Sequence, residues 1–363
     1  MFYSIIVAIY NVEPYIRNGI QQLLNQQFQN FEIILSDDGS TDGSANLCDE
    51  VSTLDSRIKV IHGKNAGAGE ARNRAIKIAQ GEYICFFDID DCVSPMWLST
   101  IYVHLSKYAP DVLEHGYREI NPFYKSSVDF SFKDKRYLSN AEIKNDYVDE
   151  FLGLRFNNGF VWNKMFKRAF IEENNLAFEN QRIQQDEVFN LLTLPKIKSM
   201  ITISDCLYYY YIYSSGNTRS GFIADRLDVY RSVRDHFMKL YDEWGINDER
   251  MLAYVYNRFF NSLLEYINFN IYHPKAPYSR NERCQILLDL FNAPDIRHCL
   301  EKMGELNIVP ASKLKSHFYK AILDKNVNKY NAYRVRLKLE TFMKTHLSKL
   351  YHKISHAETT DIH

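Results

Sequence analysis

Three aspartates stand directly behind an apolar run in the segment YICFFDIDD, at positions 88, 90 and 91. Carboxylates at the end of a buried strand are costly unless a cation or a network of hydrogen-bond donors compensates their charge. The D-x-D spacing of Asp88 and Asp90 places two carboxylates on one side of an extended turn. There they can bind Mg²⁺ or Mn²⁺, cations that keep water ligands and take further oxygens from substrate phosphates. A loop cluster that only caps nearby backbone is the alternative interpretation.

A second acidic segment, SDDGSTD at residues 36–42, follows another apolar run. A carboxylate at a strand end can accept hydrogen bonds from a ribose or from a base, and Asp38 is a candidate for this role. Ser40 or Asp42 can instead cap a following helix. Two adjacent aspartates exceed what a cap needs, so both interpretations stay open.

The segment NAGAGEARN at residues 65–73 combines glycines with an arginine. It does not fit the dinucleotide-binding pattern G-x-G-x-x-G, because Arg72 occupies the place of the third glycine and the segment follows the third strand instead of the first. A loop that leads into a helix and presents Arg72 suits an anionic ligand, or an aspartate within the protein.

The segment QQDEVFN at residues 184–190 places Asp186 and Glu187 at the expected start of a helix. Acidic residues are favoured in the first turn of a helix by the helix dipole. Alternatively, one of these carboxylates is a general base held beside a reacting hydroxyl.

Strand and helix patterns alternate over the first hundred residues and position these polar segments. Apolar runs predict strands at residues 3–9, 31–35, 58–62 and 83–87, and three-to-four spacing predicts helices at 13–25, 44–54, 69–78 and 96–107. Continuously apolar strands separated by helices predict a parallel sheet that is covered on both faces. Such sheets bind ligands at the carboxyl ends of their strands, where the acidic segments fall.

The later part of the chain changes character. The sequence predicts a helix at residues 162–174, a strand at 200–213 and helices from 222 onward, with a domain boundary in the Ser/Gly cluster at 214–221.

Seven segments, in order, resemble the inverting family 2 glycosyltransferases of GT-A fold, over roughly residues 1–220. They are SIIVAIYNVEPYI, SDDGSTDGS, NAGAGEARN, FFDIDD, FVWNKMFKRAFI, QQDEVF and LYYYYIYSSGNTRS. The resemblance implies an α/β, Rossmann-like fold with a mostly parallel sheet covered by helices, followed by a helical C-terminal region. It also implies a metal-dependent enzyme that moves a sugar from a nucleotide sugar, with UDP favoured, to a hydroxyl of a glycan or lipid-linked oligosaccharide. The products would be capsule, O-antigen or exopolysaccharide.

The resemblance also implies roles for individual residues. Asp186 would be the general base, and Asp90 with Asp88 would bind Mn²⁺ or Mg²⁺. Tyr10 would lie against the nucleotide base, and Asp38 would bind uracil or ribose. The residues expected to bind the nucleotide sugar are Ala8, Tyr10, Asn11, Glu13, Asp38, Asn65, Gly67, Arg72, Asp88, Ile89, Asp90 and Arg219. Those expected on the acceptor side are Trp162, Asn163 and Glu187.

The sequence departs from the family's pattern at four positions that usually hold proline, glutamate and Arg or His, here Ala8, Gln185, Tyr211 and Tyr213. Because the usual glutamate before the base is missing and Glu187 follows it, Asp186 and Glu187 both remain candidates for the base. Arg219, or a greater reliance on the metal, would replace the missing Arg or His beside the diphosphate.

Length and composition limit the classes of protein. The chain has 363 residues, of which 46% are hydrophobic and 25% charged, and its formal net charge is −1. Two domains are expected, at residues 1–220 and 221–363, and a globally basic nucleic-acid binder is excluded. No apolar run is long enough to span a membrane, and the six cysteines form no C-x-x-C pair, so a cytoplasmic protein with reduced thiols is expected.

Charge is distributed unevenly along the chain. Residues 313–353 contain eleven Lys/Arg and two Asp/Glu, and a basic amphipathic helix is predicted at about residues 331–354. This tail suits the anionic inner face of the cytoplasmic membrane, or it is an ordinary solvated helix. Aromatic and leucine residues at helical spacing over 222–330 predict a packed subdomain or a homodimer surface. A catalytically silent nucleotide-sugar-binding or scaffold protein is the alternative function.

Overall fold

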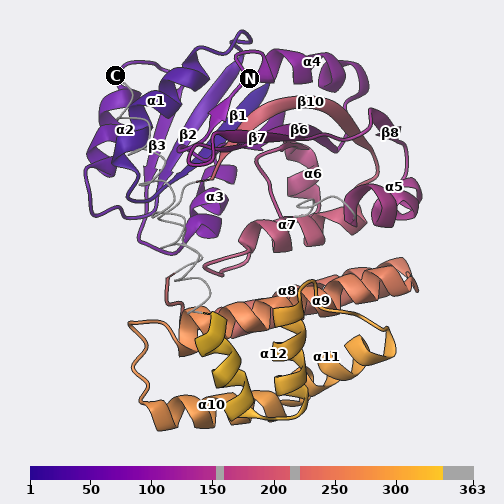
Figure 1. The fold of residues 1–363 in the computed structure, drawn as a ribbon. Helices are drawn as coiled ribbons and strands as arrows, with labels where there is room; N and C mark the ends of the chain where they lie inside the picture. Colours follow the sequence, from indigo (N-terminus) through magenta and orange to yellow (C-terminus); the bar gives the residue numbers. More distant parts are fainter. Residues whose placement is uncertain (153–158, 213–220, 338–363) are drawn as a thin grey trace, which may run out of the picture. The chain divides into compact units, whose positions relative to one another are not determined.

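Ten strands form one sheet in the order β3-β2-β1-β4-β9-β6-β10-β5, with β7 beside β6 and β8 beside β10 (Figure 1). The strands are β1 Tyr3–Ile9, β2 Phe31–Asp37, β3 Ile58–His62, β4 Tyr83–Phe86, β5 Cys92–Val93, β6 Val112–Asn121, β7 Ser126–Phe130, β8 Lys135–Tyr137, β9 Lys164–Lys167 and β10 Met200–Tyr211. Strands β1 to β4 pair in parallel, as do β6 and β10, whereas β9 lies antiparallel between β4 and β6. The predicted α/β architecture is confirmed, with a sheet that becomes mixed beyond β4.

The computed structural model describes residues 1–152, 159–212 and 221–337. The chain divides into two compact units, residues 1–251 and 252–363, and the sheet belongs to the first. Helices of the first unit are α1 Glu13–Leu24, α2 Ser44–Ser52, α3 Ala68–Ile76, α4 Trp97–Tyr108, α5 Asn140–Asp146, α6 Arg168–Glu173, α7 Gln185–Thr193 and α8 Arg226–Trp244, with short turns η1 Tyr147–Leu152 and η2 Leu194–Lys196.

Both faces of the parallel half of the sheet are covered, because side chains alternate along each strand. On one face, Ile5 and Ile9 of β1 share a core with buried residues of α1, α2 and α4, among them Ile16 and Ile101. On the opposite face α3 lies against β1 and β2, next to α6 and α7 (Figure 1). The apolar runs that predicted these strands are therefore buried on both sides.

The helix predicted at residues 162–174 is wrong over its first half. Residues 164–167 form β9, and only 168–173 form α6. The four residues KMFK are too few to show a two-residue alternation, and their partners lie far away in sequence, in β4 and β6. Pairing with distant strands therefore decides the conformation here, against the local helical pattern.

The second unit is helical where it is described. α9 Glu249–Tyr266 begins at the junction and is followed by η4 Ile267–Ile271, α10 Arg280–Asn292, α11 Pro294–Glu305, α12 Lys313–Leu323 and a helical stretch at residues 327–337. Its core contains Phe259, Leu263, Leu287, Leu300 and Phe318, all buried. The predicted helical C-terminal region is confirmed over these residues. None of the helices that the structure describes has the length and apolar character needed to cross a membrane.

The packing boundary falls later than the boundary expected at residue 220. Helix α8 packs on α7 and so belongs to the first unit. Assignment of catalysis to residues 1–220 alone stays a prediction. The amphipathic tail expected at about 331–354 lies outside the described residues from 338 onward.

Candidate active site

Four parallel strands bring the predicted polar segments to one edge of the sheet. Ile9 at the end of β1 is in register with Asp37 at the end of β2, and Asp37 is in register with His62 at the end of β3. β4 runs parallel to β1 on its other side and leads into residues 88–91, here called the aspartate loop. The loops that follow these strands therefore meet at the edge where parallel α/β sheets bind their ligands.

Arg72 joins the aspartate loop to the acidic segment at the start of α7. Its side chain is only 5% exposed, and its guanidinium donates to Asp186 at 2.5 Å and to Asp88 at 3.1 Å. The rings of Phe86 and Phe178 lie 5.9 and 5.4 Å from the guanidinium carbon. Burial opposes the charge, but Asp186 and Asp88 outweigh burial and raise the pKa of Arg72. One fixed cation therefore holds together two carboxylates that the sequence predicted to be functional.

Asp38 connects the loops that follow β2 and β3. Its carboxylate accepts hydrogen bonds from the backbone N–H groups of Ala66 at 3.0 Å and Gly67 at 2.7 Å, and pairs with Arg74 at 2.9 Å. Gly67 has a φ of 96°, a conformation that favours glycine. Because the buried Asp38 is already bonded within the protein, it shapes this edge, and its direct contact with a nucleotide stays a prediction.

The loop that follows β1 is clamped to the loop that follows β2. The side-chain oxygen of Asn11 accepts a hydrogen bond from the Thr41 N–H at 2.8 Å, and Glu13 accepts one from the Gly43 N–H at 2.9 Å. Asn11 has a φ of 53°, a left-handed conformation that turns the chain shortly after the end of β1. Asn11 and Glu13 therefore fix the loop geometry through their oxygens.

Three of the predicted nucleoside contacts are accessible to solvent. Ala8 is half-buried at the end of β1, and Asn65 is exposed. The Tyr10 side chain is 46% exposed. A tyrosine ring exposed at this edge can stack on a planar ligand. The prediction that Tyr10 lies against a nucleotide base is compatible with this position.

The aspartate loop is tied to β10 by Tyr208. The Tyr208 hydroxyl donates to Asp91 at 3.0 Å and accepts from the Asp88 N–H at 3.1 Å, while the Tyr211 N–H donates to the other Asp91 oxygen at 2.9 Å. The Tyr208 ring is buried and stacks on Trp162, with centroids 4.2 Å apart. Burial, followed by the charge of Asp88, raises the pKa of Asp91 well above its usual range. Asp91 therefore acts as an anchor of the loop.

Asp90 is the carboxylate of the loop best suited to a cation. Burial, and next the charge of Asp88, raise its pKa to about 6. A bound cation would offset both effects. Across the described ranges, no three His, Cys, Asp or Glu side chains are close enough to hold a metal by themselves. The carboxylate oxygens of Asp88 and Asp90 are of the kind that suits Mg²⁺ or Mn²⁺, which take further ligands from water and phosphate.

Ile89 anchors the aspartate loop on α1. Its side chain is buried, and a Cβ added at Gly19 would lie 2.4 Å from Ile89 Cδ1 and 2.9 Å from the Ile89 carbonyl oxygen. Such distances require the loop backbone to move. Gly19 thus permits a close approach between the helix and the loop.

Gly19→Ala is expected to lower both stability and ligand affinity at the aspartate loop. Alanine inside a helix is normally better than glycine by about 0.5–1 kcal/mol, but overpacking of this kind costs about 1–3 kcal/mol. Urea unfolding should show a net loss. Gly304→Ala in α11 is the control, since the nearest atom to its added Cβ lies at 3.7 Å, and it should stabilise the protein. Unchanged stability of the Gly19 variant would contradict the packing described.

Asp186 and Glu187 differ in accessibility. α7 begins at Gln185, after Gln184 in the left-handed conformation, with a φ of 58°. The Asp186 side chain is 18% exposed beside Arg72, whereas Glu187 is only 4% exposed. A general base must come within hydrogen-bond reach of the substrate proton. This geometry favours Asp186 over Glu187, both as the base and as the group nearer to an acceptor.

Trp162 and Asn163, which are expected on the acceptor side, are both buried. Trp162 lies in an aromatic stack, and Asn163 donates to Glu114 at 3.2 Å. Glu114 in turn forms an ion pair with Lys164 at 2.7 Å. In this structure Trp162 and Asn163 support the site from within, and their place on the acceptor side stays a prediction.

Arg219 and Tyr213 lie outside the described residues, so their roles near a diphosphate stay predictions. Sequence reasoning missed Arg74, which pairs with Asp38, and Tyr208, which anchors the aspartate loop. A buried tyrosine hydroxyl needs a hydrogen-bond partner, and this was the available signal for Tyr208.

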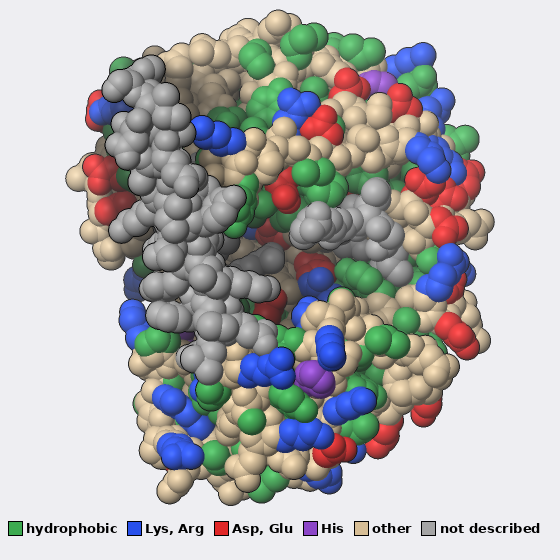
Figure 2. All heavy atoms as spheres, viewed as in Figure 1, with side chains coloured by type: hydrophobic (Ala, Val, Ile, Leu, Met, Phe, Trp, Pro, Cys, Tyr) green, Lys and Arg blue, Asp and Glu red, His purple; other side chains and the backbone are tan. Residues whose placement is uncertain are grey.

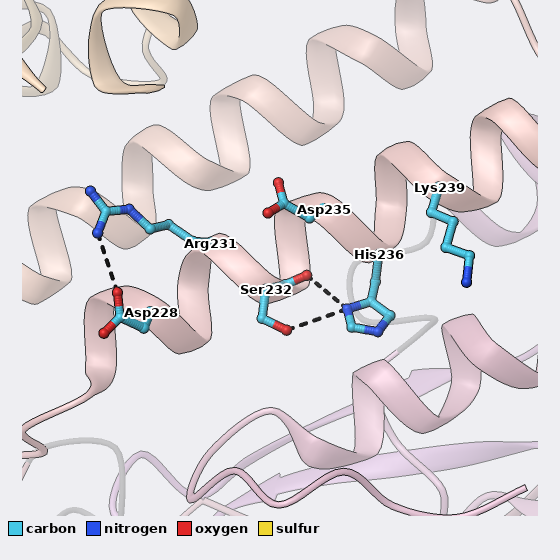
Figure 3. Close-up of a pocket in the computed structure, with 6 residues that line it drawn as sticks. All are labelled: Asp228, Arg231, Ser232, Asp235, His236 and Lys239. Atoms are coloured by element: carbon cyan, nitrogen blue, oxygen red, sulfur yellow. Dashed lines mark hydrogen bonds and ion pairs between the residues drawn. The ribbon is translucent and has the colours of Figure 1, made fainter. Parts of the chain in front are cut away.

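An open pocket on α8 contains none of the predicted site residues. Its lining side chains, drawn in Figure 3, all come from this helix: Asp228, Arg231, Ser232, Asp235, His236 and Lys239. Arg231 pairs with Asp228 at 3.2 Å, and His236 is bonded to the Ser232 carbonyl oxygen at 2.8 Å. Because the groups come from one helix face and charges of both signs are paired there, we assign no chemistry to this pocket.

Comparisons with known proteins identify a family and a fold. The sequence model of the family described as "Glycosyl transferase family 2" matches residues 4–171. The chain is 29% identical over 285 residues to the putative glycosyltransferase EpsH of Bacillus subtilis, covering 69% of this chain and 79% of EpsH. It is 34% identical over 219 residues to the glycosyltransferase GlyG of Streptococcus pneumoniae, covering 57% of this chain and 69% of GlyG.

Among solved structures, S. aureus TarS 1–349 has a TM-score of 0.62 and 21% identity, covering 94% of this chain and 92% of that chain. A second crystal structure of the same TarS fragment is a complex with UDP-GlcNAc, with a TM-score of 0.62. At this identity the likeness shows the fold. It confirms the α/β sheet followed by a helical C-terminal region.

Proposed function

The chain belongs to glycosyl transferase family 2, and we propose that it transfers a sugar from a UDP-sugar to a hydroxyl of a glycan or lipid-linked acceptor. Membership makes it a glycosyltransferase, and its relatives include glycosyltransferases such as EpsH and GlyG. The proposal adds a donor class, a divalent metal, inversion at the anomeric carbon and a place in surface-polysaccharide synthesis.

One observation carries the proposal. The buried Arg72 brings Asp186 and the aspartate loop together, although Asp186 lies about a hundred residues farther along the chain. A base on one side and a cation-binding loop on the other are what a displacement at a sugar–diphosphate bond requires. The accessible Tyr10 and the clamped loops at the same edge provide a place for the nucleotide.

The proposed chemistry is a single displacement. The acceptor oxygen forms a bond to the anomeric carbon while the bond from that carbon to the diphosphate breaks, and the hydroxyl proton passes to Asp186. A diphosphate leaves as an anion without being protonated, so one base suffices. A glycosidase, in contrast, needs a second carboxyl group to protonate its leaving oxygen.

A metal ion would supply positive charge to the departing diphosphate when bound. Asp90 is the first residue that would hold it, and Asp88 the second, since Arg72 already balances part of the Asp88 charge. Arg72 also links the two acidic segments directly in this structure. Binding, orientation and proton transfer are thus divided among different side chains.

The proposed metal site predicts a pH dependence. Asp90 must be ionised to bind a cation, and its raised pKa of about 6 means that protons compete with metal below that pH. The apparent Kd for Mn²⁺ is expected to rise about tenfold between pH 7 and pH 5. Isothermal titration calorimetry in the presence of UDP measures it. Asp90→Asn should bind Mn²⁺ weakly at both values, and a flat pH profile for the unmodified protein would contradict this assignment.

The experiment that tests the function is a donor screen on the full chain. Because TarS binds UDP-GlcNAc, this donor is tested first, followed by UDP-glucose, UDP-galactose and GDP-mannose, each with Mn²⁺. A ligand of the folded state raises its melting temperature, and UDP release then reports turnover. Metal-dependent stabilisation with UDP release supports the proposal. Stabilisation by a nucleotide sugar without UDP release, whichever acceptor is added, favours a silent binding protein. If no nucleotide sugar stabilises the protein, the proposal is contradicted.

A further inference from the structure

Two arginines of the second unit converge on one tyrosine ring. Tyr272 follows η4, Arg283 lies in α10, and Arg334 lies in the helical residues 327–337. Their guanidinium carbons are 5.6 Å (Arg283) and 3.4 Å (Arg334) from the centre of the Tyr272 ring. The Tyr272 hydroxyl donates to Asn331, which holds the ring in place between the two helices.

Neither arginine has an acidic partner among the residues that the structure describes. Several arginines of the first unit, such as Arg72 and Arg168, pair with carboxylates. The Nε atoms of Arg283 and Arg334 are instead buried and lack any hydrogen-bond partner. Buried donors without partners are rare in folded proteins, and a bound anion is one way to satisfy them.

We propose that Arg283 and Arg334 form a binding site for a phosphate group, as a monoester or a diester. Each guanidinium presents donors in a planar fork that matches phosphate oxygens. A tetrahedral phosphate has enough oxygens to accept hydrogen bonds from both guanidinium groups, whereas a carboxylate offers two oxygens in a single plane. Stacking on Tyr272 orients the cations without neutralising them.

The charge of the surroundings favours an anion. Residues 252–337 contain thirteen Lys/Arg against seven Asp/Glu, whereas residues 1–251 contain 27 Lys/Arg against 35 Asp/Glu. Lys and Arg side chains are spread over the face of this helical unit that Figure 2 shows. Such a field raises the local concentration of anions.

The phosphate can belong to a soluble molecule or polymer, or to a lipid headgroup, because the chemistry recognised is the same. The site lies in a different unit from the nucleotide-sugar site, so the proposal does not rest on the proposed function. Its test is therefore a binding experiment and requires no turnover.

The experiment compares three forms of the full chain: the unmodified protein, Arg283→Gln/Arg334→Gln, and the control Arg280→Gln/Lys313→Gln. The control removes the same charge from exposed positions of the same unit. Soluble probes are inorganic phosphate and glycerophosphoglycerol, measured by isothermal titration calorimetry. Vesicles of phosphatidylcholine with and without phosphatidylglycerol are measured by sedimentation. Phosphate bound at any other site is common to all three proteins and cancels in the comparison.

We expect the Arg283/Arg334 variant to bind at least one probe about fivefold or more weakly, and the control within about twofold of the unmodified protein. Weaker binding of the soluble probes by the Arg283/Arg334 variant identifies a soluble phosphate source. Weaker binding by this variant that is confined to phosphatidylglycerol vesicles identifies a lipid headgroup. Equal binding by all three proteins, equal loss in both variants, or no binding by the unmodified protein overturns the proposal. If circular dichroism shows that the double variant is unfolded, Arg334→Lys replaces it, and unchanged affinity in that variant also overturns the proposal.

Discussion

Asp186→Asn is expected to lower the turnover number by about a hundredfold to ten-thousandfold, the range typical for loss of a general base. Asparagine keeps the shape of the side chain and can still accept the hydrogen bond from Arg72. It cannot take up a proton from an acceptor hydroxyl. Donor affinity should therefore change little, because the aspartate loop and Arg72 remain in place. Steady-state kinetics and donor titration on the same preparation separate the two quantities.

Glu187→Gln is the matched control for this substitution. Glu187 is the neighbouring carboxylate in α7, and it is buried, with only 4% of its surface exposed. The change should affect stability more than turnover. If Glu187→Gln abolishes transfer while Asp186→Asn leaves it near the original rate, the assignment of the base is reversed.

The parallel half of the fold and much of its functional edge follow from sequence pattern. Strands buried on both faces are largely apolar, and polar residues such as Asp37 and Asp88 come where the apolar runs end. Parallel strands point their carboxyl ends the same way, which brings those residues together without any knowledge of side-chain contacts. The convergence of the acidic segments could therefore be predicted.

The rest of the fold and of the candidate site depends on contacts between distant parts of the chain. β9 forms by antiparallel pairing with both β4 and β6, and no local sequence pattern indicates this pairing. The sequence likewise does not show that the Trp162 ring stacks on the Tyr208 ring. The Arg72–Asp186 pair joins α3 to α7, and its geometry requires the folded sheet. Charges and motifs indicate which residues act, whereas burial decides which of them can touch a ligand.

Tyr208→Phe is expected to weaken metal-dependent donor binding by about tenfold, equivalent to about 1.4 kcal/mol. The change removes the hydroxyl that donates to Asp91 and accepts from the Asp88 N–H. Both groups are then left without that partner inside the protein, at a cost of about 1–3 kcal/mol in unfolding free energy. The ring itself stays stacked on Trp162, so the effect comes from the hydroxyl alone. Donor titration and urea unfolding measure the two losses.

Tyr83→Phe separates loop positioning from general stability. The Tyr83 hydroxyl is also buried and donates to the Pro110 carbonyl oxygen at 3.0 Å, but it lies at the opposite end of β4 from the aspartate loop. Its loss should reduce unfolding free energy by a similar amount and leave donor affinity unchanged. A tenfold loss of affinity in both variants would mean that donor binding follows overall stability. A loss confined to Tyr208→Phe would instead show that β10 positions the aspartate loop for the proposed metal. The same strand also contributes the Tyr211 N–H to this loop.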